Sequence, residues 1–336
     1  MREIVVTGGA GFIGSNFIRW AMEHDDSIHV TVLDALTYAG NTCNLDGLDD
    51  ARLSFVRGDV CDKEIVREVL APADACVHFA AQTHNDASIA SPEDFVRTNV
   101  TGTYTLLEAV REFGLRFHHV STDEVYGDLP LDSSTRFTEE SPYHPSSPYS
   151  STKAAADMLV RAWVRTYGVR ATISNCSNNY GPYQHVEKFI PRQITNILTG
   201  REPKLYGDGR NIRDWMHVDD HSSAVWAILQ KGEIGETYLI GAGNERSNIE
   251  VLEMILGEFG LPKDAFGRVD DRPGHDMRYA LDPSKLSRTL GWAPAHSDFE
   301  AGLRETVAWY RNNPGWWEKA KEESERRYLS LASALR

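Results

Sequence analysis

A glycine-rich segment near the start of the chain limits the possible folds more than any other feature. Thr7-Gly8-Gly9-Ala10-Gly11-Phe12-Ile13-Gly14 follows a short apolar run and opens a stretch whose apolar residues recur at helical spacing. Glycines allow the tight turn and the close approach of backbone to a pyrophosphate, and the unpaired N–H groups at the start of the helix face the anion. The segment therefore predicts a strand, turn and helix that bind a dinucleotide, with Gly8 or Gly9, Gly11 and Gly14 as its glycines.

The rest of the first half repeats this alternation of strand and helix. Short apolar runs predict buried parallel strands at residues 3–6, 28–33, 54–57, 75–79, 117–121 and 171–174. Amphipathic stretches between them predict helices at 14–23, 63–70, 93–113 and 150–167. This pattern predicts an α/β fold with a doubly wound, Rossmann-type parallel sheet.

The composition of the sequence changes after about residue 177, where residues typical of turns become frequent. The first example is Asn178-Asn179-Tyr180-Gly181-Pro182. We expect residues 1–177 to form the dinucleotide-binding domain. Residues 178–336 should form mainly a smaller substrate-binding region, part of which returns to the sheet. No flexible linker separates the two parts, so we expect them to enclose one cleft.

The overall charge of the chain restricts its partners. Lys and Arg number 35 and Asp and Glu 49, so the net charge is −14, which disfavours general binding to nucleic acid or to a membrane surface. A cationic pocket for one small phosphorylated ligand remains compatible with this charge, because such a pocket needs only a few residues.

The cysteines and the first residues predict a compartment. Cys43, Cys61, Cys76 and Cys176 are far apart and show no zinc-type spacing, so we expect no metal site and a reducing environment. The chain passes from Met1 almost directly into its first strand, which leaves no room for a signal peptide's apolar region. No apolar run reaches membrane-spanning length. We therefore expect a cytoplasmic protein.

An acidic residue specifies the dinucleotide. Asp34 closes the second expected strand twenty positions after Gly14, where a carboxylate accepts hydrogen bonds from the adenosine ribose. A 2′-phosphate would meet this negative charge, and Ala35 offers no arginine to accommodate it. NAD is therefore expected rather than NADP, with Asp59 and Val60 after the third strand bordering the adenine.

Tyr149 and Lys153 lie one helical turn apart and so share a helix face. We expect the ammonium to lower the pKa of the phenol, so that the tyrosine takes a proton from an alcohol as hydride leaves.

Together with the glycine segment, this YxxxK pattern resembles the extended short-chain dehydrogenase/reductase family. Further segments are similar to the dTDP-glucose 4,6-dehydratases, and the similarity covers nearly the whole chain; these segments are Leu36-Thr37-Tyr38-Ala39-Gly40-Asn41, Ser121-Thr122-Asp123-Glu124-Val125-Tyr126-Gly127, Asn175-Cys176-Ser177-Asn178-Asn179-Tyr180-Gly181-Pro182-Tyr183, Tyr206-Gly207-Asp208-Gly209, Arg213-Asp214-Trp215 and Asp271-Arg272-Pro273-Gly274-His275-Asp276. The resemblance implies an NAD-dependent hydro-lyase that converts dTDP-glucose into dTDP-4-keto-6-deoxyglucose and water, with no net use of cofactor.

The resemblance also implies roles for particular residues. A ketone at C4 acidifies the C5 proton, so loss of water from C6 needs a base and an acid, and two neighbouring carboxyl groups suit this. On resemblance Asp123 is the acid and Glu124 the base, while Thr122 and Tyr149 contact the C4 oxygen and Lys153 completes the catalytic set. The implied cofactor residues are Gly8, Gly11, Phe12, Ile13, Gly14, Asp34, Leu36, Thr37, Asp59, Val60, Phe79, Ala80, Ala81, Thr83, Thr98, Tyr149, Lys153 and Asn179. The implied substrate residues are His84, Thr122, Asn178, Lys188, Phe189, Lys204, Tyr206, Arg213, Asn244, Arg272 and His275.

One segment departs from the family pattern. The family commonly reads Ala-Glu-Ser-His-Val-Asp-Arg-Ser, whereas this chain has Ala81-Gln82-Thr83-His84-Asn85-Asp86-Ala87-Ser88 and loses charges at Gln82 and Ala87. The departure leaves Asp123 and Glu124 in place, so it bears on nucleotide preference more than on the type of reaction.

Four other interpretations of the sequence stay open, and a dehydratase acting on another nucleotide is the third of them. A 4-epimerase or a decarboxylase would share the cofactor site and YxxxK, but an epimerase needs no base at C5 and a decarboxylase needs a partner for a glucuronate carboxylate. A non-catalytic NAD-sensing module could dispense with Tyr149 and Lys153. The helices expected at 93–113 and 150–167 resemble those of a four-helix dimer contact, which implies a homodimer.

Overall fold

The centre of the protein is a seven-stranded parallel sheet. The computed structural model describes residues 1–271 and 274–334. Its main sheet has the order β10-β6-β5-β4-β1-β2-β3, and the strands are β1 (Glu3–Thr7), β2 (His29–Asp34), β3 (Leu53–Arg57), β4 (Ala75–His78), β5 (Arg116–Thr122), β6 (Arg170–Cys176) and β10 (Thr237–Ile240). The doubly wound fold predicted from the sequence is confirmed, and each of the six expected strands ends within two residues of its predicted bounds.

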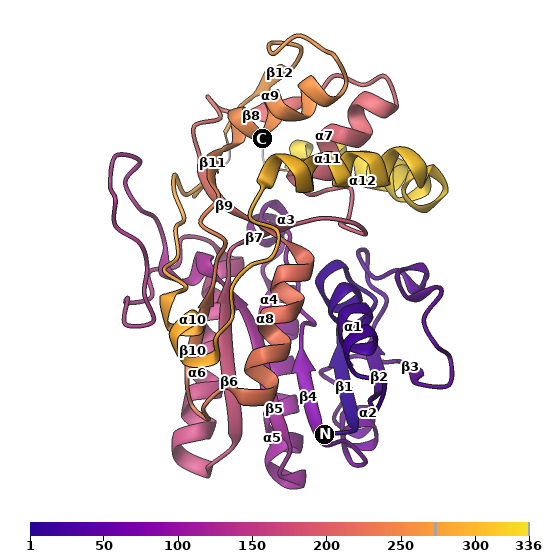
Figure 1. Cartoon of the computed structure of the whole chain (residues 1–336), viewed down its shortest axis with the longest axis vertical. Coiled ribbons are helices and arrows are strands. Elements are labelled where there is room, and N and C mark those ends of the chain that lie inside the picture. Colours follow the sequence, from indigo (N-terminus) through magenta and orange to yellow (C-terminus); the bar gives the residue numbers. More distant parts are fainter. Residues whose placement is uncertain (272–273, 335–336) are drawn as a thin grey trace.

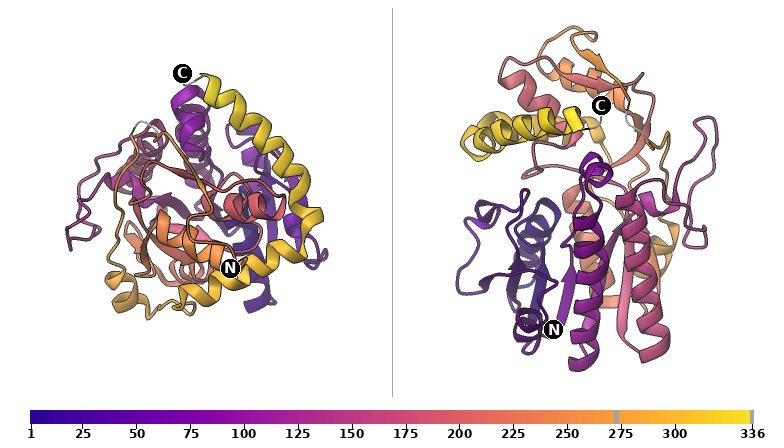
Figure 2. Two further views of the ribbon diagram at one scale, coloured as in Figure 1. Left: turned by 90° about the horizontal axis from the view of Figure 1, so that it is seen from above. Right: turned by 180° about the vertical axis from the view of Figure 1, so that it is seen from behind.

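Helices cover both faces of this sheet. One face packs against α1 (Phe12–His24), α8 (Val218–Lys231) and α10 (Ser284–Leu290), and the other against α2 (Lys63–Leu70), α5 (Thr103–Phe113) and α6 (Pro148–Tyr167). Alternate residues of β1 serve the two faces, since Ile4 and Val6 belong to the first core and Val5 to the second. Figure 1 shows α1 and α8 in front of the sheet, and the view from behind in Figure 2 shows α5 and α6.

The helix expected at 93–113 forms in three parts. A short turn, α4 (Glu93–Phe95), leads into the π-helical segment η2 (Val96–Gly102), and only then does α5 begin. Asn99 in η2 is buried, and its side chain pairs with the backbone N–H and C=O of Gln82 and with Thr152 of α6. The wider turn therefore ties the loop after β4 to α6, in keeping with the frequent occurrence of such turns near functional sites.

A second lobe lies above the C-terminal ends of the strands (Figure 1). It contains a three-stranded sheet of β7 (Asn178–Tyr180), β9 (Ile212–His217) and β11 (Glu245–Ser247), and the pair β8 (Lys204–Tyr206) and β12 (Gly267–Val269). Its helices are α7 (Phe189–Leu198), α9 (Asn248–Glu258), α11 (Phe299–Asn312) and α12 (Pro314–Ala334). A separate core that includes Trp215, Ile255, Val307 and Tyr310 holds it together.

The chain between these elements returns to the main sheet before it completes the lobe. β10 pairs in parallel with β6 and forms the sheet's edge. Seen from above, α12 runs along one side of the molecule (Figure 2, left). None of the helices within residues 1–271 and 274–334 has the length and apolar character needed to cross a membrane.

Candidate active site

A cavity of about 710 Å³ lies where the two lobes meet. The lower lobe contributes the ends of β1, β2, β4 and β5 and the start of α6, and the upper lobe contributes α7, β8, β9 and α12. Because the strand order reverses between β1 and β4, this is the position at which doubly wound sheets bind their ligands.

The glycine loop lines one end of this cavity. Gly8 has a φ of +71°, and a Cβ there would lie 2.6 Å from the backbone nitrogen of Ala80, so only glycine fits without displacing the loop after β4. A Cβ on Gly14 would collide with the carbonyl of Gly8. α1 begins at Phe12 with no side-chain cap on its first N–H groups. These open donors and the narrow backbone cradle fit the pyrophosphate of a dinucleotide.

Asp34 lies at the end of β2 and also faces the cavity. Its Oδ2 accepts a hydrogen bond from the Ala10 backbone at 3.0 Å, and its Oδ1 accepts one from the Leu36 backbone at 2.8 Å. Burial raises the pKa of this carboxyl, and the two backbone donors oppose that shift. Each oxygen keeps a further lone pair, so the residue that shapes the turn is also able to accept a ribose hydroxyl.

The proposed acid, Asp123, begins a 3₁₀ turn, η3 (Asp123–Tyr126), directly after β5. Its carboxyl is buried, and burial followed by the nearby Glu124 raises its pKa well above the usual range, while Arg213 opposes the rise. Thr122 Oγ1 donates to Asp123 Oδ1 at 3.1 Å. The buried Oδ2 has no hydrogen-bond partner within the described residues. The arrangement suits a carboxyl that keeps its proton and donates it.

Glu124 is held differently from its neighbour. Its side chain is half-buried, and Asn85 Nδ2 lies 3.0 Å from Oε2 and 3.4 Å from Oε1. An amide N–H donor favours an ionised acceptor. Two adjacent residues therefore occupy different environments, as acid and base roles require.

Tyr149 and Lys153 do lie together in the cavity wall on α6, but their electrostatics differ from the expectation. Burial, and next to it the charge of Glu124, raises the pKa of the Tyr149 phenol well above its usual value. Lys153 is also buried, which lowers its pKa to about 8, and its Nζ donates to the carbonyl of Val120 at 2.8 Å. The expectation that the phenol's pKa is lowered is therefore wrong for the arrangement seen here, where burial raises it.

Cationic side chains enter the cavity from the upper lobe. Lys188 Nζ donates to the carbonyl of Thr83 at 3.0 Å and so joins the two lobes. The Arg213 guanidinium is buried and donates to the carbonyls of Ile212 and Asp276, both at 2.8 Å. Backbone carbonyls thus place both side chains, and Lys188 Nζ also lies 3.8 Å from Glu187 Oε1.

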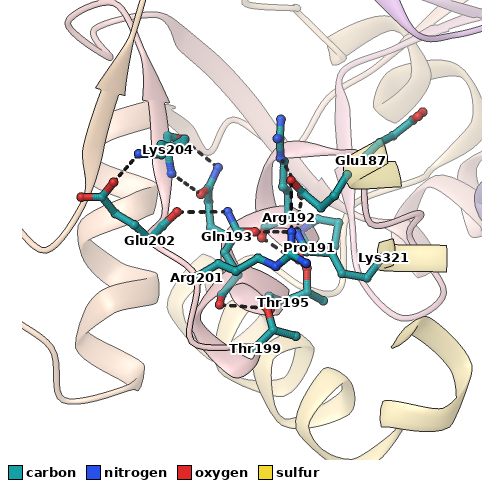
Figure 3. A network of polar contacts seen from close by, with 12 residues as sticks. Glu187, Pro191, Arg192, Gln193, Thr195, Thr199, Arg201, Glu202, Lys204 and Lys321 are labelled. Atoms are coloured by element: carbon teal, nitrogen blue, oxygen red, sulfur yellow. Dashed lines mark hydrogen bonds and ion pairs between the residues drawn. The ribbon is translucent and has the colours of Figure 1, made fainter. Parts of the chain in front are cut away.

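A network around α7 positions the third cation, Lys204 (Figure 3). The Gln193 side chain donates to the Lys204 carbonyl and accepts from its N–H, both at 2.9 Å, which fixes β8 on α7. Behind it, Lys321 of α12 is buried and donates to Asn196 and Glu325. β8 therefore presents Lys204 and Tyr206 to the cavity.

Most of the residues implied by the resemblance come together around this one cavity, although they come from both lobes. Those that line it are Gly8, Gly11, Phe12, Ile13, Gly14, Asp34, Thr37, Asp59, Val60, Phe79, Ala80, Ala81, Thr83, His84, Thr98, Thr122, Asp123, Glu124, Tyr149, Lys153, Asn178, Asn179, Lys188, Phe189, Lys204, Tyr206, Arg213 and His275. Leu36 and Asn244 do not line it. Their backbone N–H groups bind Asp34 and Asp214 instead. Arg272 lies outside the described residues.

Several lining residues were missed by the sequence reading. α12 contributes Ser324, Arg327 and Tyr328. The Arg327 guanidinium lies 4.6 Å from the centre of the Tyr38 ring, and the Arg192 guanidinium lies 3.7 Å from the centre of the Tyr328 ring. No motif marks these residues, because the helix carries a mixture of charged and apolar residues that is ordinary for a surface helix.

Outside the cavity, His217, Asp219 and His296 form a group whose ligand-type atoms lie within 4.8 Å of one another. The two imidazole rings are stacked with centroids 4.2 Å apart, and His296 Nδ1 lies 3.1 Å from Asp220 Oδ1. The expectation that the protein needs no metal stays a prediction.

Comparison with known proteins agrees with this geometry. The model of a family described as GDP-mannose 4,6 dehydratase matches residues 5–306. A dTDP-glucose 4,6-dehydratase from Mycolicibacterium smegmatis is 63% identical over 326 residues, covering 97% of this chain and 98% of the relative. A dTDP-glucose 4,6-dehydratase from Streptomyces venezuelae, solved with NAD and TYD bound, superposes with a TM-score of 0.91 at 48% identity, covering 95% of this chain and 99% of that one.

A more distant structure marks the limit of the fold as a guide to function. The UDP-glucose 4-epimerase of Thermus thermophilus, solved with NAD, has a TM-score of 0.84 at 30% identity, covering 93% of this chain and 99% of that one. Epimerases and dehydratases thus share the scaffold, and the sequence identity separates them. This chain belongs to the extended short-chain dehydrogenase/reductase family and, within it, to the dTDP-glucose 4,6-dehydratases.

Proposed function

We propose that this protein converts dTDP-glucose into dTDP-4-keto-6-deoxyglucose and water, with NAD as its resident cofactor. The observation that carries the proposal is the pair Asp123 and Glu124. One carboxyl is buried with a raised pKa, and the other receives an amide donor, beside Tyr149 in the same cavity as the glycine loop. An epimerase needs only the tyrosine and the cofactor.

The residues that would hold NAD fit its parts. The glycine loop and the start of α1 suit the pyrophosphate, Asp34 suits the adenosine ribose, and Asp59 and Val60 border the adenine. Bound NAD supplies an acceptor for the C4 hydride and a donor for C6 at the end of the reaction. The further contacts proposed are Phe12, Ile13, Leu36, Thr37, Phe79, Ala80, Ala81, Thr83, Thr98 and Asn179.

Side chains of the protein carry out the proton transfers. Tyr149, in its phenolate form and with Thr122 beside it, takes the C4 hydroxyl proton as C4 becomes a ketone, and Lys153 lies one turn further along α6 in the same cavity wall. Glu124 removes the C5 proton, which the ketone has made acidic. Asp123 protonates the C6 hydroxyl as its C–O bond breaks, so that water leaves.

The nucleotide end of the substrate is assigned to the upper lobe. Lys188, Lys204 and Arg213 offer positive charge to a diphosphate. Lys204 also forms an ion pair with Glu202, and Lys188 Nζ lies 3.8 Å from Glu187 Oε1. The proposed substrate set is completed by His84, Asn178, Phe189, Tyr206, Arg272 and His275. Asn244, which does not line the cavity, stays in this set as a prediction from the resemblance.

One assay tests this function directly. The protein is incubated separately with dTDP-, UDP- and GDP-glucose, and the mass of each product is measured by mass spectrometry. We expect a product lighter by one water from dTDP-glucose, formed fastest of the three. A product of unchanged mass with inverted C4 would favour the epimerase, and no reaction despite bound NAD would favour a sensing module.

Two further points belong to the proposal. A homodimer through η2, α5 and α6 is supported by exposed apolar side chains on two of these elements, Val96 on η2 and Met158 and Tyr167 on α6. Sedimentation velocity tests it, and Met158→Glu should weaken it. A cytoplasmic location is supported by the four cysteines, all of which are unpaired.

A further inference from the structure

Asn85 stands between the two elements that carry the proposed proton-transfer groups. It is the first residue of α3 (Asn85–Ala90), and its Nδ2 donates to both oxygens of Glu124. Its Oδ1 accepts from Ser147 Oγ at 3.1 Å. Ser147 in turn caps the N-terminus of α6, the helix of Tyr149 and Lys153. One side chain thus links the turn after β5 to the start of α6.

The chemistry of the three partners fixes which way the amide faces. A carboxylate only accepts hydrogen bonds, so the NH₂ end of Asn85 must face Glu124. The oxygen end then faces Ser147, whose hydroxyl is able to donate. Asn85 is itself anchored at its backbone, since Ser88 Oγ donates to its carbonyl at 2.7 Å. The amide is therefore held at both ends and cannot turn over without losing two hydrogen bonds.

This residue is one of the departures in the segment 81–88, where the family pattern has an aliphatic valine. Valine would fill the space but would offer no hydrogen bond to the carboxylate. From this we infer that Asn85 is a positioning residue for Glu124, which holds the carboxylate in the cavity in place for removal of the C5 proton. The inference rests on the base role proposed above for Glu124.

The charge of Glu124 acts on the other groups in the cavity. It contributes to the raised pKa values of Asp123, Tyr149 and Tyr279, after burial in each case. A misplaced Glu124 carboxylate should slow C5 deprotonation, the step that Glu124 carries out, more than C4 oxidation, which depends on Tyr149.

The test replaces Asn85 with valine and follows the two halves of the reaction separately. Stopped-flow absorbance of the reduced nicotinamide measures C4 oxidation, and deuterium uptake at C5 from heavy water measures C5 deprotonation. We expect oxidation to be unchanged and C5 deprotonation to slow about 10-fold at neutral pH, as for loss of other supporting contacts. The defect should be confined to C5 deprotonation. Asn85→Gln, which keeps an amide donor, should restore part of the rate.

Ala90→Val is the matched control, because Ala90 is exposed on the same helix and outside the cavity. It should leave both rates unchanged. An Asn85→Val enzyme with a normal rate of C5 deprotonation would overturn the inference, and so would equal losses of oxidation and deprotonation, which would mean a structural role only. Glu124→Gln distinguishes failure of this inference from failure of the proposed base role. If the Glu124→Gln variant dehydrates dTDP-glucose normally, the assignment of Glu124 as the base is itself wrong.

Discussion

Asp123→Asn separates the chemistry of the acid from the stability of the fold. Burial raises the pKa of the Asp123 carboxyl and so favours its neutral, protonated form, and asparagine is a neutral side chain of the same shape. The asparagine oxygen still accepts from Thr122, as Oδ1 of the aspartate does. The substitution therefore removes one transferable proton and little else.

Asp123→Asn should lower the rate of water loss, but it should not lower the stability of the fold. A general acid contributes about 10²- to 10⁴-fold to a rate, which corresponds to about 3–5 kcal/mol of barrier for loss of water. Stability should not fall. Since the pKa of Asp123 is raised by folding, its contribution to stability is complete below its unfolded value of about 3.9 and is lost as the pH rises toward the folded value. Asparagine does not ionise, so the variant should be as stable as the wild type in acid and more stable at pH 8.

Single-turnover absorbance with dTDP-glucose, product mass and thermal unfolding at several pH values measure these effects together. We expect reduced nicotinamide to form normally and to persist, because C4 oxidation still has Tyr149. Combining the change with Glu124→Gln should deepen the accumulation. Near-normal dehydration, or no accumulation despite substrate binding, would refute the acid role, and a lower melting temperature at pH 8 would refute the reasoning from burial.

Three other substitutions test the rest of the cavity. Tyr149→Phe should abolish both reduction of NAD and loss of water, because no group remains to take the C4 hydroxyl proton; a normal absorbance trace would exclude that role. Asp34→Arg should raise the dissociation constant of NAD and lower that of NADP, and an unchanged NAD affinity would remove Asp34 from the site. Gly8→Ala should cost more than the ~1–2 kcal/mol of a left-handed backbone alone, because its Cβ also meets Ala80. Gly114→Ala is its control in urea unfolding, since Gly114 has a φ of +69° with no atom within 4 Å of its Cβ position; equal losses would contradict the close approach.

The sequence predicted the parts of the fold that depend on neighbours in the chain. β1, the glycine turn and α1 follow from one continuous segment, because a buried parallel strand is a short apolar run and a helix shows its own period. β10 was not placed individually. Its four residues pair with β6, some sixty positions earlier, and nothing within Thr237–Ile240 shows that partner.

The same limit applies within the site. Asp123 and Glu124 are adjacent in the sequence, and only burial shows which of them keeps its proton. The link from Glu124 through Asn85 to Ser147 joins three segments that are far apart in the chain. The predicted direction of the Tyr149 pKa shift was wrong. Helical spacing shows that Tyr149 and Lys153 lie near each other, but it does not show that the phenol is buried.

The net charge of −14 describes the whole chain and does not describe the charge inside the cavity. Charges at the surface act over about 8 Å at physiological ionic strength, so distant carboxylates have little effect inside the cavity. There the diphosphate would meet Lys188, Lys204 and a buried Arg213 whose guanidinium is held by backbone carbonyls. The dinucleotide would meet backbone N–H groups at the start of α1, which carry no formal charge to count. An acidic surface therefore weakens binding to long polyanions, because they must lie along many surface charges. It has little effect on a single enclosed diphosphate, whose binding depends on the donors nearest to it.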